Sequence, residues 1–336
     1  MRTLRIEGRL RRSSSRAYPP AVAIDLCGAL LAVAIAVPTP AGAQGAPLDR
    51  TWPAATTAPV VVRAPRMTVR IDVWDREAVR ARGPAGARPL RIEATRSSPD
   101  GLIVDIESRG GRGDLSDTVF VTIPRRAPVS VESYWGAIVV VGAEGDVSLE
   151  SYFEEVAYRG GAARVSVRGF HSEVHVEAPR ARSIVAESGG GDVHVLTGSG
   201  QLRVESVRGD IEVRARGPLA EADIRSTGGS ILLSASLAAS AAVTLDTHHG
   251  SIDMELDPGA GARFRLETYL GAIENDLGPS SPARRRGPVR VNAVDFPLGD
   301  ARALVVASTW RGDIRLRRRD QAPMPSPAAR IPSPSR

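Results

Sequence analysis

The sequence predicts an all-β protein: a β-solenoid similar to a parallel β-helix, with about nine to ten coils of 18–21 residues and an N-terminal β cap. Three observations favour this fold. Aromatic residues make up only 4% of the 336 residues, whereas Gly (33) and Pro (25) are frequent, which is typical of short strands joined by turns. Apolar and polar residues alternate through most of the chain, as in strands with one buried face. One phrase also recurs at a nearly constant spacing.

The first 43 residues have the order of a secretory signal peptide. An Arg-rich start is followed by an apolar run from Leu26 to Val37 and by Ala41-Gly42-Ala43. The run has 12 residues, whereas a membrane-spanning helix needs about 20. We therefore expect export with cleavage after Ala43, a periplasmic or extracellular location such as the cell surface, and no transmembrane segment in the mature chain.

Charge and cysteine content exclude several classes of function. All 44 basic residues are Arg, and the net charge of +6 falls to +2 without residues 1–43, which carry six Arg and two acids. This balance, together with export, argues against a nucleic-acid partner. The single cysteine, Cys27, lies in the expected signal peptide, so the mature chain would have no disulfide and no cysteine nucleophile.

Of the two segments before the repeat, we expect one to be disordered and the other to be folded. Residues 44–62 are rich in Pro and Ala, and we expect a disordered linker there. Residues 63–127 contain alternating runs with looser spacing, and we expect them to form the β cap that protects the edge of the first coil. These runs are Met67–Trp74, Leu90–Ala94, Leu102–Ile106 and Thr118–Pro124.

Residues 128–277 carry the repeat Φ-x-Φ-x-[ST]-x-x-G-[DS]-Φ-x-Φ. Each copy predicts a strand, a tight turn and a second strand. Such strands must stack on the next copy, roughly 4.8 Å away, to bury their apolar faces, and the Ser/Thr hydroxyls are expected to bond turn amides. The Ser/Thr position or its equivalent is Ser133, Ser151, Gly169, Ser188, Ser206, Ser226, Thr247, Thr268 and Thr309.

The last step of this series is twice as long as the others. It spans 41 residues, from Thr268 to Thr309, and PVRVNAV from Pro288 resembles a degenerate copy. We therefore expect a linker or loop at 278–290, a terminal coil at 291–317 and a disordered basic tail at 318–336.

Three phrases resemble a known family. They are RIDVWD at Arg70–Asp75, VFVTIPRRAPVSVES at Val119–Ser133 and the serial S-x-x-G-D-[IV]-x-[VL], as in SVRGDIEV from Ser206. From about Val69 to Leu316 the chain is similar to the DUF4097 family of bacterial envelope proteins, whose β-strand-repeat domain is regarded as adhesin-like. The resemblance implies export and a β-solenoid fold, and it supplies no catalytic residues.

Aromatic residues follow the Ser/Thr position in three successive copies. Stacking of the copies would gather them at one corner, where they form a candidate binding patch. The alternative is that they pack beneath the N-terminal cap or a loop. The candidate residues are Tyr134, Trp135, Tyr152, Phe153 and Phe170, with His171 beside them.

A second candidate site lies on the strands after the turn. His175 and His194 fall on the same outward face of neighbouring coils, flanked by carboxylates that include Glu173, Asp192 and Glu212. Imidazoles and carboxylates at this spacing are candidate ligands for Zn²⁺ or a similar ion. A solvated face is the alternative, since Asp after Gly is also a turn preference.

Enzyme signatures are missing from the sequence. We find no G-x-S-x-G, H-E-x-x-H, P-loop or Rossmann phrase after a strand, and we expect no enzyme and no cofactor. The sequence favours an adhesin-like binding or scaffolding surface in the cell envelope, with an envelope glycan or envelope protein as partner. The alternatives are a carbohydrate-active β-helix enzyme, since fold does not fix function, and a periplasmic ligand or metal sensor.

Overall fold

The computed structural model describes residues 48–83, 90–97, 101–108, 118–257, 259, 261–279, 283–286 and 289–319. Every regular element among these residues is a β-strand, and the strands belong to one hydrogen-bonded sheet. The described chain is therefore all-β, as the repeat predicts. The expected signal peptide at 1–43 and the tail from residue 320 lie outside the described residues. Within the described ranges, no helix has the length and hydrophobicity of a membrane span.

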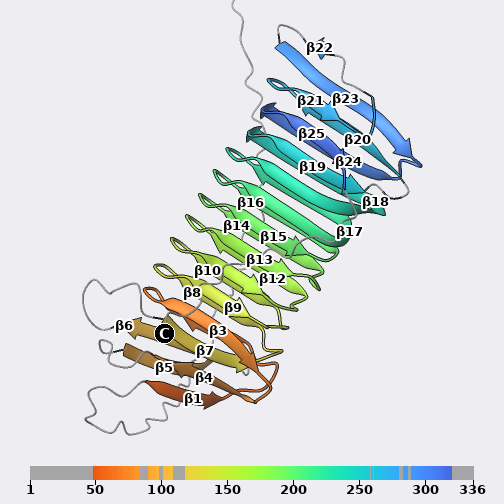
Figure 1. The fold of residues 1–336 in the computed structure, drawn as a ribbon. Helices are drawn as coiled ribbons and strands as arrows, with labels where there is room; N and C mark the ends of the chain where they lie inside the picture. The colour runs from red at the N-terminus through yellow and green to blue at the C-terminus, as the bar shows by residue number, and fades with distance from the viewer. Residues whose placement is uncertain are drawn as a thin grey trace, which may run out of the picture. The chain divides into compact units, whose positions relative to one another are not determined.

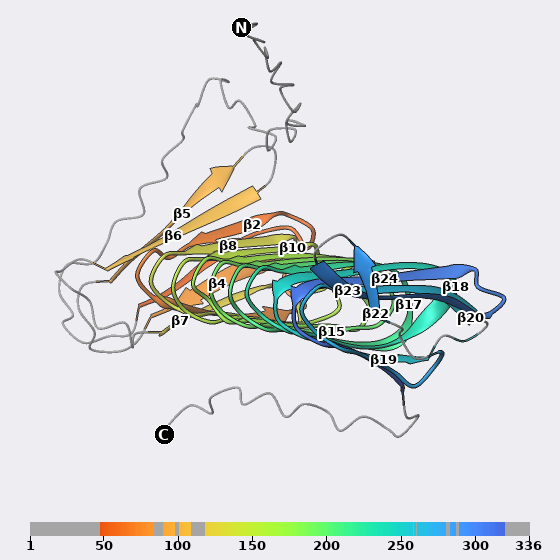
Figure 2. The ribbon, with the colours of Figure 1, turned by 90° about the horizontal axis from the view of Figure 1, so that it is seen from above.

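The repeat copies stack in parallel and in register (Figure 1). β8, β10, β12, β14 and β16 form one ladder, in which Val129 pairs with Val147 and Val147 with Val165. β9, β11, β13 and β15 form the other. The strands are β8 (Val129–Ser133), β9 (Ile138–Val141), β10 (Val147–Ser151), β11 (Val156–Arg159), β12 (Arg164–Gly169), β13 (Val174–Ala178), β14 (Ser183–Ser188), β15 (Val193–Thr197), β16 (Gly200–Ser206), β17 (Ile211–Ser226), β18 (Ile231–His249) and β19 (Ile252–Asp257). One strand from each ladder makes a layer, and Figure 2 shows successive layers overlapping in projection.

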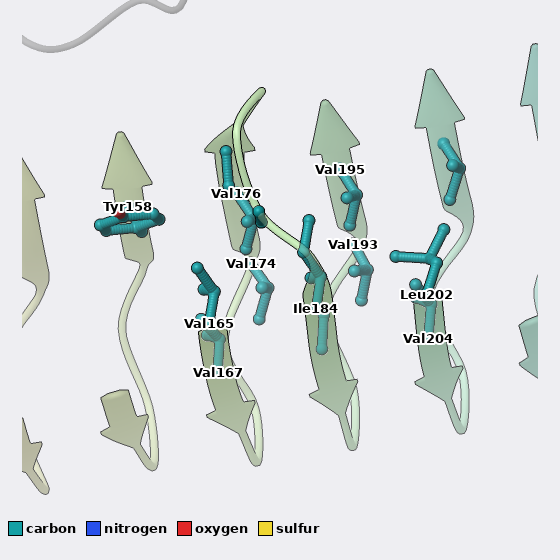
Figure 3. Packing of buried hydrophobic residues seen from close by; sticks show 14 of the residues in the cluster. Tyr158, Val165, Val167, Val174, Val176, Ile184, Val193, Val195, Leu202 and Val204 are labelled. Carbon is teal, nitrogen blue, oxygen red and sulfur yellow. The ribbon is translucent and has the colours of Figure 1, made fainter. Parts of the chain in front are cut away.

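The core fills the space between the two ladders. Val165 and Val167 from one ladder lie near Val174 and Val176 from the other, and all four are buried (Figure 3). Burial of each such aliphatic side chain contributes about 1.5–3 kcal/mol. The alternating sequence pattern therefore reports the inward face correctly.

Tyr158 is the largest fully buried side chain among the described residues, in a core that is otherwise mostly aliphatic. Its hydroxyl donates to the Ala143 carbonyl over 2.8 Å and accepts from the Ala162 amide over 2.9 Å. Burial raises the pKa of this phenol to about 12. The hydroxyl thus links the return turns of two neighbouring layers.

The Ser/Thr position is buried and its hydroxyls bond to the turns. The hydroxyl oxygens of Ser206 and Ser226 accept hydrogen bonds from the amides of Gly209 and Gly229, over 3.0 Å and 2.9 Å. A Cβ at Gly209 would lie 2.1 Å from a backbone oxygen of the preceding turn. The turns therefore stack too closely for a side chain at this glycine, which explains its recurrence in the repeat.

The N-terminal strands depart from the expected linker. β1 and the first three residues of β2 fall within residues 44–62, where a disordered linker was expected, so that prediction is wrong for 49–53 and 60–62. The VVVR run of β2 pairs in parallel with both β6 and β8, and its buried valines outweigh the Pro/Ala-rich surroundings. The strands are β1 (Asp49–Pro53), β2 (Val60–Arg63), β3 (Thr68–Trp74), β4 (Ala78–Arg82), β5 (Leu90–Ser97), β6 (Gly101–Ser108) and β7 (Thr118–Pro124).

The C-terminal strands depart from the expected terminal coil at 291–317. β23 is antiparallel to β20, and the layer β24–β25 lies between β18–β19 and β20–β21 (Figure 1). β22 also lies within the expected linker at 278–290. The strands are β20 (Gly261–Thr268), β21 (Ile273–Asn275), β22 (Ala283–Arg286), β23 (Val289–Gly299), β24 (Ala303–Arg311) and β25 (Ile314–Arg318).

Charge favours the position of the inserted layer. Arg315 of β25 lies between two acids, 3.5 Å from Asp253 and 3.2 Å from Glu274. Without β24–β25, these two acids would occupy facing positions in neighbouring strands, which is unfavourable. The nearby acids, Asp253 first and then Glu274, raise the pKa of Arg315.

Both ends of the stack follow the same plan. At the N-terminal end the layer β2–β3 lies between β6–β7 and β8–β9, and the outer strands β1, β4 and β5 pair antiparallel. Arg–Asp pairs join antiparallel neighbours at each end, Arg80 with Asp49 and Arg263 with Asp295. Each pair lowers the pKa of its carboxyl group through the hydrogen bond from the arginine. Antiparallel strands therefore cover edges that the parallel ladders would leave open.

Candidate functional site

The turns after β8, β10 and β12 carry the predicted aromatic residues. The register places Ser133, Ser151 and Gly169 side by side, so the residues that follow them also line up. We call this group the aromatic edge; it consists of Tyr134, Trp135, Tyr152, Phe153 and Phe170.

The rings of the aromatic edge stack in two files. In one file, Tyr152 and Phe170 have ring centroids 4.3 Å apart and planes within 10°, and Tyr134 packs against Tyr152 at 4.7 Å. In the other, Trp135 and Phe153 have ring centroids 4.0 Å apart and planes within 6°. The ladder spacing therefore sets the ring spacing.

The aromatic edge is open to solvent. Tyr134, Trp135 and Phe170 are 43%, 38% and 39% exposed, and Tyr152 and Phe153 are partly exposed. The alternative of rings covered by the N-terminal strands does not match this exposure within the described part of the chain. Rings fixed on a rigid edge can bind flat apolar surfaces.

A second aromatic group lies on the same side of the turns, and the sequence reasoning missed it. Trp310 stacks with Tyr269 at 4.6 Å and lies parallel to His248 at 6.1 Å. These residues follow Thr309, Thr268 and Thr247, the same position as in the aromatic edge. Trp310 and neighbouring Leu270 are 40% and 54% exposed. The sequence shows that these residues follow the Ser/Thr position, but Trp310 lies between His248 and Tyr269 only because the layer β24–β25 is inserted between their layers.

The predicted metal ligands converge only in part. His175 and His194 are partners in the parallel pairing of β13 and β15, with imidazole centroids 4.9 Å apart and planes within 8°. Glu173 joins them, with Oε1 2.9 Å from His175 Nε2 and 3.7 Å from His194 Nε2. These three residues offer ligand atoms that all lie within 4.8 Å of one another.

The other two predicted ligands lie outside this group of three. Glu212 Oε2 is 3.2 Å from His194 Nδ1, on the far side of that ring. Asp192 Oδ1 accepts a hydrogen bond from the Asp210 amide over 2.8 Å, and Asp210 Oδ1 accepts one from the Ser230 amide over 2.7 Å. Asp192 therefore stabilises a turn, which is the alternative that its position after Gly suggested.

Three solved structures show distant similarity to this chain. A putative cell adhesion protein from Clostridium sporogenes is 8% identical, with a TM-score of 0.20 and coverage of 81% of this chain and 100% of that chain. A putative adhesin from Bacteroides fragilis is 10% identical, with a TM-score of 0.38 and coverage of 81% and 97%. A putative lipid binding protein from Parabacteroides distasonis is 8% identical, with a TM-score of 0.34 and coverage of 80% and 96%. No match was found among curated proteins.

The family model for Toastrack DUF4097 matches residues 98–264. This range holds most of the parallel layers, the whole aromatic edge and the Glu173–His175–His194 group. It is narrower than the resemblance expected from Val69 to Leu316, and it agrees with the family named there. Residues 98–264 of this chain thus belong to the Toastrack DUF4097 family.

Proposed function

We propose that the protein is an exported, non-enzymatic binding module of the cell envelope that holds a glycan on its aromatic edge. The observation that carries the proposal is a group of five stacked rings, three of them exposed and two partly exposed, in a chain with only 4% aromatic residues. Because the turns and the neighbouring rings already hold these side chains, binding costs little conformational entropy.

Phe170, the last ring of its stack, favours a glycan over a protein as the ligand. Phe170 stacks on Tyr152, and the next turn along the stack carries Gly189 and Gly190, which have no side chains. Among the described residues, no ring stacks on the other face of Phe170. The C–H face of a pyranose can lie against such a ring face, because the partial negative charge of the ring face attracts the C–H groups of the sugar.

The second aromatic group extends the proposed surface. Four layer steps separate Phe170 from His248 in the stack, roughly 19 Å at a strand spacing of about 4.8 Å. A glycan of several sugar units spans this distance and can contact both groups at once. Two linked contacts raise the overall affinity above that of either alone.

We also infer the finer architecture that presents this edge. The parallel layers from β8–β9 onward correspond to the nine sequence copies, and we assign them as coils of a β-solenoid. β1 and β4–β7 form the N-terminal β cap in this assignment, with β2–β3 inside it. The in-register pairing of β8, β10 and β12 sets the spacing of the turns that follow them, so the rings of the aromatic edge repeat at the strand spacing.

Retention on envelope glycans tests the proposal. The purified protein is applied to immobilised glycan fractions of a bacterial envelope, beside the variants Phe170→Ala and Trp135→Ala. Phe120→Ala is the matched control, because Phe120 is an equally exposed aromatic residue on β7, away from the aromatic edge. We expect at least about tenfold weaker retention for the first two variants and no change for the control.

Other outcomes would overturn the proposal. Equal retention by all variants would place the binding site elsewhere on the molecule. Retention that survives removal of glycan from the fractions, but not removal of protein, would identify a protein partner. Release of shortened glycan into solution would show an enzyme.

A further inference from the structure

We propose that Glu173, His175 and His194 bind a divalent transition-metal ion of the Zn²⁺ type on the outer face of β13 and β15. This site is separate from the aromatic edge and does not depend on the proposed glycan binding. The site is supported by the pairing of the strands, the positions of three ligand atoms and a carboxylate behind one of the imidazoles.

The strand pairing holds the two imidazoles at a short and fixed distance. Val174, Val176, Val193 and Val195 are buried on either side of the histidines, which directs His175 and His194 outward. The two residues are direct partners in a parallel ladder, and their rings lie parallel at 4.9 Å. Neither backbone position can slide without breaking the ladder, so the two side chains start from fixed neighbouring positions. Because each Nε2 lone pair lies in the plane of its own ring, the two parallel rings must turn toward each other to share one ion.

Two of the three distances between ligand atoms are close to the spacing that a metal needs, and the third pair of atoms lies within 4.8 Å. Donor atoms about 2.0–2.2 Å from a tetrahedral Zn²⁺ lie roughly 3.3–3.6 Å from one another. Glu173 Oε1 is 2.9 Å from His175 Nε2 and 3.7 Å from His194 Nε2. The side chains are partly exposed, and rotation about their side-chain bonds would bring all three atoms onto one ion and leave a fourth position for water.

Glu212 supports the site from behind. Its Oε2 lies 3.2 Å from His194 Nδ1, and its Oε1 lies 2.5 Å from the Arg214 Nε. A proton on Nδ1 that bonds this carboxylate leaves the Nε2 lone pair free to face Glu173 and His175. Carboxylates commonly orient metal-binding histidines in this way.

The chain offers a matched control. His248 and His249 form a second imidazole pair, with Nδ1 atoms 2.7 Å apart. Among the described residues, no carboxylate completes a group of three ligands with this pair. A metal that merely prefers neighbouring histidines would bind both pairs, whereas the proposed site requires Glu173.

Zn²⁺ titration of the purified protein by calorimetry tests the proposal. We expect one Zn²⁺ per chain, and at least tenfold weaker binding for His175→Ala and for His194→Ala. Glu173→Gln and Glu212→Gln should each weaken binding about tenfold or more, and Glu212→Gln should do so without changing the stoichiometry. The variant His248→Ala/His249→Ala should bind as the unchanged protein does.

Two results would overturn the proposal. One is the absence of saturable Zn²⁺ binding by the unchanged protein, which would leave Glu173 as an ordinary hydrogen-bond partner of His175. The other is binding that survives His175→Ala/His194→Ala and is lost in His248→Ala/His249→Ala. His175 and His194 are exposed enough for their replacement to preserve the fold, and circular dichroism of each variant checks this.

Discussion

The indole ring of Trp135 lies flat against the phenyl ring of Phe153, with centroids 4.0 Å apart and planes within 6°. The two residues are 18 positions apart in the sequence and stand on consecutive turns. The in-register pairing of β8 with β10 brings them together. The stacking of these two rings therefore stabilises the two turns and also forms part of the surface that we propose to bind glycan.

The stacked pair should be measurable as a coupling energy. The variants Trp135→Ala, Phe153→Ala and the double variant form a double-mutant cycle in chemical denaturation. We expect a coupling of about 0.5–1.5 kcal/mol, the usual value for an aromatic pair. Additive effects of the two substitutions would mean that the rings do not stack in solution.

The variant Tyr158→Phe should be less stable than the unchanged protein at neutral pH. Removal of the hydroxyl leaves the Ala143 carbonyl and the Ala162 amide without their partner, at a cost of about 1–3 kcal/mol. Urea denaturation at pH 8 measures this loss. An unchanged free energy of unfolding would show that water replaces the hydroxyl.

The same tyrosine predicts a stability change in alkaline solution. Its pKa is about 12 in the folded chain against about 10 when unfolded, so between these values the unfolded chain binds fewer protons and stability falls as pH rises. The free energy of unfolding should drop by up to about 2–3 kcal/mol from pH 10 to pH 12, beyond any drop in Tyr158→Phe. Parallel curves for the two proteins would contradict a raised pKa.

Substitution of two glycines can test whether the turns stack closely. A Cβ at Gly209 would lie 2.1 Å from the Gly191 oxygen, whereas the nearest atom to a Cβ at Gly161 is a side-chain carbon 3.5 Å away. We expect Gly209→Ala to destabilise the protein by about 2–4 kcal/mol and Gly161→Ala to change stability by less than about 1 kcal/mol. Thermal unfolding of both variants checks the difference, and equal effects would show that the turns are not in contact.

Charge reversal at Arg315 should loosen the inserted layer. Arg315→Glu would place three acids in adjacent strands at Asp253, residue 315 and Glu274. We expect earlier unfolding at low ionic strength, and a smaller effect in concentrated salt because salt screens the repulsion. Arg302→Glu is the control, since Arg302 pairs with Asp300 within one turn. The explanation fails if the two variants unfold alike at low salt.

Much of the layered core could be predicted from sequence, because the inward-facing residues of each strand follow from the alternation of apolar and polar residues within each copy. Val129 pairs with Val147 and Ile138 with Val156, as the spacing of the copies indicates. The aromatic edge follows from the same spacing. Its exposure could not be predicted, because the alternating pattern does not say which elements cover a turn.

The order of the layers could not be predicted, since each copy has nearly the same strands and would pair with any other. The position of Trp310 between His248 and Tyr269 depends on that order. The charges of Asp253, Arg315 and Glu274 are a sequence signal for it, and this signal is visible only once the layers are aligned. The position of Glu173 depends on a side-chain rotamer, which sequence spacing does not determine.

The interleaved ends limit how this chain can change in length. At the C-terminal end the layer β24–β25 is enclosed by layers that precede it in the chain, and at the N-terminal end the layer β2–β3 is enclosed by layers that follow it. A copy added beyond β20–β21 or before β6–β7 would therefore meet an antiparallel strand instead of an open ladder. Chain order and stacking order agree only in the interior, from Val129 to Asp257. Whole repeats can therefore be gained or lost by duplication or deletion within that interior run, while the two interleaved ends stay constant as fixed terminators of the array.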